Sequence, residues 1–219
     1  MADLYLGFDP GGDRRFGVAL LDHEHLSTST VSTVADAISW AIGTCGSRRP
    51  IAAGIDTLLH WTTTKSGMRP GDLWLRGMYP ADAKSVMAPN SLFGAMAIGG
   101  MALAIKLRQV WPEIELNETH PKMLVRALRN ERYRPETIDS AIRWFVNCAH
   151  CPAWTPQGED ELDAALSAWA TREGLADGWI DIVGQGGELI FPAGPVRYLW
   201  PRAISGIGGT KSAFSKDHQ

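Results

Sequence analysis

The chain of 219 residues has the length of one domain or of one domain with elaborations, and its 45% hydrophobic and 21% charged residues are ordinary for a globular protein. Its 24 acidic and 21 basic residues give a net charge of −3, which excludes binding to nucleic acid or membrane by bulk charge alone. Three cysteines exclude a disulfide scaffold. The opening MADLYLGFDP has no basic region before an apolar core, so we expect no signal peptide and a cytoplasmic protein.

The first sixty residues alternate between strand-like runs and turns. Buried strands are predicted at 3–9 and 15–21, on either side of a Pro-Gly-Gly turn. A third strand at 26–34 alternates polar and β-branched residues, as an edge strand does. Helical spacing follows over 36–45, and the apolar run at 50–59 predicts a strand that is central in a sheet.

Residues 60–90 form an insertion with no long period of its own. A connection of about thirty residues is longer than most, and such loops are usually functional or disordered. Its aromatic residues argue against disorder. A long helix is then predicted over 91–110, with Asn90 or Ser91 as its N-cap. Its apolar stretch, 92–105, is too short to span a bilayer, so we expect no membrane partner.

The second half of the chain is mainly helical. Beyond the long helix we expect one strand and three helices, at 115–119, 122–130, 135–148 and 159–172. The tail, 184–219, is rich in glycine and proline and is predicted to be irregular, with one short strand at 188–191. No repeat or linker divides the chain, so we predict a single domain over 1–219 with a core at about 3–172.

This order of elements predicts an α/β fold with a mixed five-stranded sheet flanked by helices. Three sequential strands give an antiparallel meander, and the later strand–helix alternation adds parallel crossover units. That is the ribonuclease-H-like order, in which the first and fourth strands are parallel neighbours and the fifth strand lies beside the fourth.

Acidic residues occur where these strands end. Asp9 ends the first strand, Asp56 lies toward the end of the fourth and Glu118 ends the fifth, so the three should meet at one edge of the sheet. Asp160 and Asp163 are three residues apart and share one face of the last helix. Clustered carboxylates repel one another unless a cation lies between them, and hard oxygen ligands suit Mg²⁺ or Mn²⁺. We therefore expect a metal-dependent site built from these acids.

Several segments resemble known nucleases. GFDPGGDRRFGVAL at 7–20 is similar to the opening hairpin of ribonuclease-H-fold nucleases, and EDELDAAL at 159–166 resembles the D-x-x-D-A helix of RuvC-type Holliday-junction resolvases. The whole chain resembles a predicted nuclease family catalogued as a domain of unknown function, the four-twenty-nine family. The matching pieces are IDTLL at 55–59, GMRPGDLWLR at 67–76, ETHP at 118–121 and DELDAALSAWAT at 160–171.

The resemblance implies a nuclease that hydrolyses RNA or DNA phosphodiesters with two Mg²⁺ or Mn²⁺ ions. Asp9 and Asp56 would hold the ions, and Asp160 and Asp163 would complete the site. Glu118 is a further candidate catalytic acid, although the resolvases use no ligand from the fifth strand.

Other polar residues are candidates for substrate binding. Arg69, Asp72 and Arg76 have helical spacing, and two interpretations stay open. Either the arginines clamp phosphate while Asp72 orients one of them, or the group is a surface ion pair that closes the insertion. His120 is either a general base or phosphate donor beside Glu118, or a turn residue before a proline.

Two further functions compete with the nuclease. One is a non-catalytic ribonuclease-H-like binding module. The other is an ATP-binding protein of the actin and sugar-kinase type, which would need two such lobes. The C-x-x-C pair, Cys148 and Cys151, is more consistent with packing than with a redox or zinc centre, because it follows a predicted helix and lacks nearby partner ligands.

Overall fold

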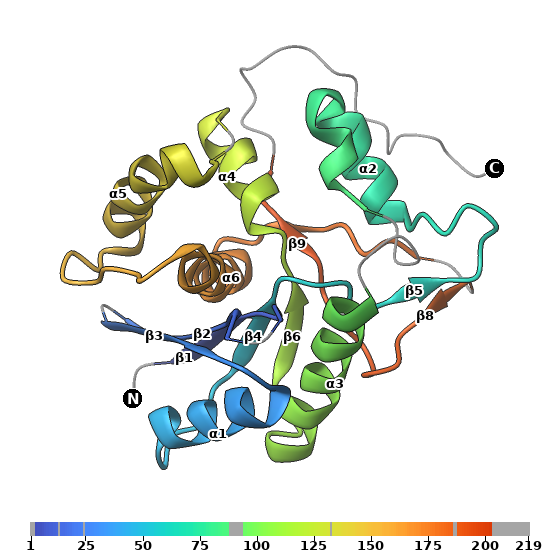
Figure 1. Ribbon diagram of the computed structural model, residues 1–219. Helices are drawn as coiled ribbons and strands as arrows, with labels where there is room; N and C mark the ends of the chain where they lie inside the picture. Colours follow the sequence, from blue (N-terminus) through green and yellow to red (C-terminus); the bar gives the residue numbers. More distant parts are fainter. Residues whose placement is uncertain are drawn as a thin grey trace.

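The computed structural model describes residues 3–12, 14–23, 25–87, 94–131, 133–185 and 188–202. A five-stranded mixed sheet runs through its centre in the order β3-β2-β1-β4-β6 (Figure 1). Its strands are β1 (Leu4–Asp9), β2 (Phe16–Asp22), β3 (His25–Val31), β4 (Ala52–Ile55) and β6 (Glu115–Glu118). The first three strands are antiparallel, whereas β4 pairs in parallel with both β1 and β6. The predicted mixed five-stranded sheet is confirmed.

Helices cover both faces of this sheet. They are α1 (Val34–Cys45), α2 (Pro70–Met78), α3 (Gly94–Val110), α4 (Pro121–Arg129), α5 (Ile138–Ala149) and α6 (Glu159–Ala176). Helices α4, α5 and α6 lie on one side, and α1 and α3 lie on the other (Figure 1). Alternate residues of β1 enter the two resulting cores: Leu6 packs in the core shared with α1 and α3, and Tyr5 in the core shared with α6. A strand covered on both faces is mostly apolar, as β1 is from Leu4 to Phe8.

Helix α6 packs directly on the sheet because glycines on three adjacent strands leave room for its backbone. A Cβ atom on Gly7 of β1 would lie 2.0 Å from the Ala164 carbonyl oxygen. Gly17 of β2 and Gly54 of β4 face other α6 carbonyl oxygens at 1.9 and 2.1 Å. This close approach holds the first turns of α6, which carry two of the predicted acids, over the ends of β1 and β2.

The insertion after β4 contains regular structure over its described residues, 60–87. It contains β5 (Trp61–Thr62), α2 and a 3-10 helix, η1 (Pro80–Ser85). The strand predicted at 50–59 is shorter than expected, so Asp56 lies just beyond its end. The N-cap expected at Asn90 or Ser91 falls outside the described residues.

The tail is mostly irregular over its described part, as predicted, and β8 (Leu189–Ile190) confirms the short strand expected at 188–191. Two further strands, β7 (Ile180–Asp181) just before the tail and β9 (Leu199–Trp200) within it, were not predicted. Strand β8 pairs with β5, and Arg197 exchanges backbone hydrogen bonds with β6. Trp200 is 1% exposed, so the tail contributes to the core. Residues 203–219 lie outside the described part. No helix in the described part is both long enough and apolar enough to cross a membrane.

Candidate functional site

Four of the five predicted acids gather at the carboxyl-terminal edge of the sheet. Asp9 is the last residue of β1, and Asp56 follows β4, where its N–H donates to the Phe8 carbonyl oxygen at 2.8 Å. Asp160 and Asp163 project from the first turns of α6. The Asp160 backbone lies over Gly17, the register partner of Asp9. We call these four carboxylates the acidic site.

The acidic site holds more negative charge than its surroundings compensate. Burial raises the pKa of Asp9 well above its ordinary value, and Asp163, Asp56 and Asp160 raise it further. Burial and Asp163 likewise raise the pKa of Asp56 well above its ordinary value. Burial raises the pKa of Asp163 to about 7, although a nearby lysine opposes the shift. The pKa of each of these three carboxyl groups is therefore raised, and a cation bound among them would lower it.

Three residues outside the sequence predictions touch the acidic site. The Lys122 ammonium lies 2.6 Å from a carboxylate oxygen of Glu159 and 3.7 Å from one of Asp163. The buried Tyr133 hydroxyl donates to Asp163. The exposed Arg15 donates to Asp160 at 3.2 and 3.4 Å.

Only part of this environment carries a sequence signal. Lys122 follows a His-Pro pair that begins α4 directly after β6, so its place at the same sheet edge could have been inferred. Tyr133 lies in a connection, and no pattern pointed to it.

The acidic site fits a divalent cation in the chemistry of its donors. All four side chains offer carboxylate oxygens, the ligands that Mg²⁺ and Mn²⁺ prefer, and three of them, Asp9, Asp56 and Asp163, are buried with a raised pKa. Among the residues that the structure describes, however, no group of three or more His, Cys, Asp or Glu side chains is arranged to hold a metal ion. The donor atoms are therefore of the type that binds Mg²⁺ or Mn²⁺, but they are not arranged as a closed ligand shell.

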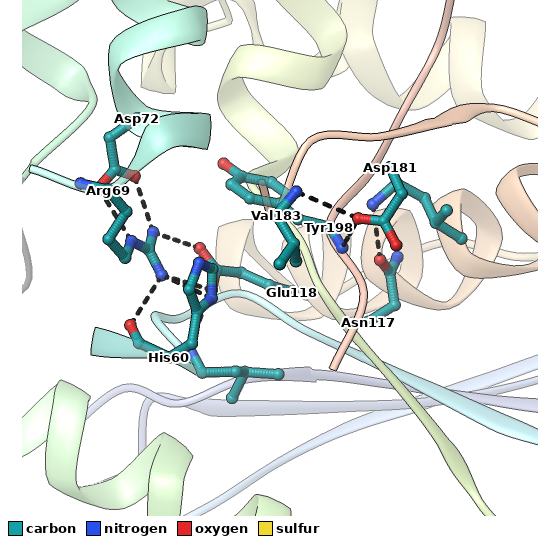
Figure 2. A network of polar contacts seen from close by, with 10 residues as sticks. His60, Arg69, Asp72, Asn117, Glu118, Asp181, Val183 and Tyr198 are labelled. Atoms are coloured by element: carbon teal, nitrogen blue, oxygen red, sulfur yellow. Dashed lines mark hydrogen bonds and ion pairs between the residues drawn. The ribbon is translucent and has the colours of Figure 1, made fainter. Parts of the chain in front are cut away.

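Glu118 belongs to a different, buried network (Figure 2). Its two carboxylate oxygens accept hydrogen bonds from the Arg69 guanidinium at 2.6 and 2.7 Å. Arg69 also donates to Asp72 at 2.7 and 2.9 Å, and it is 0% exposed. His60 Nδ1 lies 3.2 Å from Glu118. Burial alone would raise the pKa of Glu118, but Arg69 and His60 together lower it to about 2.

This network places three of the predicted residues in the interior. The Arg69 guanidinium is enclosed, which argues against a phosphate clamp; the ion pair with Asp72 of the second interpretation is present, but it is buried and not at the surface. Glu118 binds Arg69 through both carboxylate oxygens, and its role as a catalytic acid stays a prediction. Glu118 lies at the end of β6 as expected, and its ion pair with Arg69 joins the insertion to the sheet.

The two remaining substrate-binding candidates lie near η1. Arg76 Nε donates to the Ala83 carbonyl oxygen at 2.9 Å, and His120 Nε2 lies 3.1 Å from the Ser85 carbonyl oxygen. Both side chains thus brace the insertion. Burial raises the pKa of the Cys148 thiol, and the buried Cys151 thiol donates to the Ala149 carbonyl oxygen at 3.4 Å.

No family model, curated protein or solved structure matches this chain. The strand order and the acidic site are therefore the observations from which a function is inferred.

The raised pKa of Asp163 predicts how stability depends on pH. Between pH of about 4 and 7 the folded chain retains a proton that the unfolded chain has lost, so the free energy of unfolding falls as pH rises. Asp163→Asn removes this group. Between pH 5 and pH 8 the free energy of unfolding should therefore fall by roughly 1–3 kcal/mol less in this variant than in the wild-type protein. Urea unfolding with a chelator present measures this. Asp139→Asn, at an exposed position on α5, is the control; equal pH dependence in both variants would contradict the prediction.

Proposed function

We propose that this protein is a divalent-metal-dependent nuclease with a ribonuclease-H-like fold, which hydrolyses phosphodiester bonds of nucleic acid. One observation carries the proposal: carboxylates from the ends of β1 and β4 and from α6 gather at one sheet edge, where burial and neighbouring carboxylates raise the pKa of Asp9 and Asp56. The strand order β3-β2-β1-β4-β6, which is the order expected of a ribonuclease-H-like sheet, supports it.

In the proposed mechanism, Asp9, Asp56, Asp160 and Asp163 would hold two Mg²⁺ or Mn²⁺ ions. Such ions, when bound, would activate the attacking water and stabilise the leaving oxygen of a phosphodiester. The protein's own groups orient the ligands: Tyr133 donates to one oxygen of Asp163, and Arg15 binds Asp160. These hydrogen bonds limit the rotation of both carboxyl groups.

Lys122 has two roles in the proposed mechanism. Its ammonium lowers the pKa of both Asp56 and Asp163, and so keeps part of the site ionised before a metal binds. Because it is 36% exposed, it can also meet a phosphate that approaches from solvent.

Asp9→Asn tests the proposal. Wild-type protein with Mn²⁺ should cleave at least one of single-stranded, duplex or branched RNA or DNA, and Mn²⁺ should raise its melting temperature. Asp9→Asn should lower cleavage at least 100-fold and remove most of the Mn²⁺ effect, because it removes a central ligand charge while keeping nearly the same shape. Circular dichroism checks folding, and the exposed Asp139→Asn is the matched control.

A non-catalytic binding module with the same fold is the second candidate. It is favoured by Lys122, whose ammonium already compensates part of the acidic charge, and by the open arrangement of the carboxylates. Wild-type protein that is neither stabilised by Mn²⁺ nor able to cut any of these substrates would establish this candidate over the nuclease.

A further inference from the structure

A cavity of about 350 Å³ lies beside the acidic site. Its walls come from the end of β4, from η1 and the residues after it, from the start of α3 and from the start of α4. Asp56 and Lys122 border both the cavity and the acidic site. A ligand can therefore extend from the carboxylates into the cavity without crossing another element.

The walls combine an apolar surface with a few polar groups. The apolar part is formed by Leu58, Val86, Met87 and Met96. Glu118 and Asp72 border the cavity too, and the Arg69 guanidinium pairs with both, so it offsets one of their two negative charges. Ligand sites commonly have this composition, in which apolar walls supply affinity and a few polar groups supply orientation.

We propose that this cavity binds the base and sugar of a single unpaired nucleotide, whose phosphate lies at the acidic site. The inference rests on the proposed nuclease function. A volume of about 350 Å³ is at the small end of ligand pockets and has room for one nucleoside but not for a stacked base pair. A nucleotide in a duplex must leave its stack to enter such a pocket, at a cost of a few kcal/mol.

The chemistry of the walls suits this ligand. Met87 and Met96 present polarizable thioethers, which make favourable contacts with flat aromatic rings. The Lys122 ammonium borders the end of the cavity nearest the acids, where the phosphate must lie. We therefore infer that the preferred substrate is single-stranded, or has an unpaired nucleotide at the cleaved position.

Binding of mononucleotides tests the cavity separately from catalysis. AMP and UMP, titrated into the whole protein by calorimetry with and without Mn²⁺, should bind at least tenfold more tightly than ribose 5-phosphate or inorganic phosphate. Met87→Asp should weaken AMP and UMP binding at least tenfold, because Met87 is 36% exposed and borders the cavity. Leu73→Asp makes the same change at a 57% exposed position that does not border the cavity, and should leave binding unchanged.

A second variant fills the cavity instead of charging it. Met96→Trp should also weaken AMP and UMP binding, and circular dichroism with thermal unfolding shows whether either variant has lost its fold. In cleavage assays the wild-type protein should prefer a single strand over a fully paired hairpin stem of the same sequence.

Each outcome bears on either the cavity or the nuclease. Equal affinity for AMP and ribose 5-phosphate, or binding unchanged in folded Met87→Asp and Met96→Trp, would overturn the cavity proposal even if the protein cleaves nucleic acid. Equal cleavage of the strand and the stem would overturn it as well. If no substrate is cut but base-dependent binding sensitive to Met87 is found, the nuclease function fails and the nucleotide pocket stands.

Discussion

Arg69→Met is expected to lower the free energy of unfolding by about 3–5 kcal/mol. Arg69 is the cation between two buried carboxylates, Glu118 and Asp72, which are 1% exposed each. Methionine keeps much of the side-chain volume but leaves both negative charges in the interior without an opposite charge. The cost arises because neither carboxylate can reach water and each must bind a proton or remain unpaired.

Arg76→Met on the same helix is the matched control. Arg76 is half-buried, and its Nε donates to a backbone carbonyl oxygen. Losing that contact should cost only about 1 kcal/mol. Urea unfolding near neutral pH measures both variants, and similar losses at the two positions would show that the buried network is not an important contributor to stability. Arg69→Lys should rescue little, because an ammonium cannot pair bidentately with two carboxylates.

Gly7→Ala is expected to lower the free energy of unfolding by roughly 2–4 kcal/mol, at or beyond the usual range for overpacking. The new methyl group would lie 2.0 Å from the Ala164 carbonyl oxygen and 2.6 Å from the Ala168 nitrogen. Both atoms belong to the α6 backbone, which cannot rotate aside as a side chain can. The helix must move away from the sheet, and Asp160 and Asp163 move with it.

Gly43→Ala makes the same substitution where there is space. Gly43 lies on the exposed side of α1, and a Cβ there has no neighbour within 4 Å. Because alanine favours a helix more than glycine does, this variant should be more stable by up to about 1 kcal/mol. Thermal and urea unfolding of the pair should give opposite signs; a neutral or stabilising Gly7→Ala would contradict the inferred packing of α6.

The sequence by itself determined the strand order and the place of the acids. Apolar runs of strand length, broken by turns, and the alternation that follows them predict a five-stranded mixed sheet, which the structure confirms. Because neighbouring parallel strands end at the same edge of a sheet, the sequence alone predicts that Asp9 and Asp56 lie close together. The spacing of Asp160 and Asp163 likewise places them on one helix face.

Only the tertiary structure decided which charges are partners. Arg69 and Glu118 are 49 residues apart, and nothing in their local spacing distinguishes a buried ion pair from an exposed phosphate clamp. In the tail the sequence predicts the strand near 188–191 but not β9, because β9 is two residues long and is held by pairing with a distant segment. Burial and long-range pairing depend on which surfaces the fold brings together. Local periodicity predicts the strands and helices themselves, but it does not predict which distant segments pair or which side chains become buried.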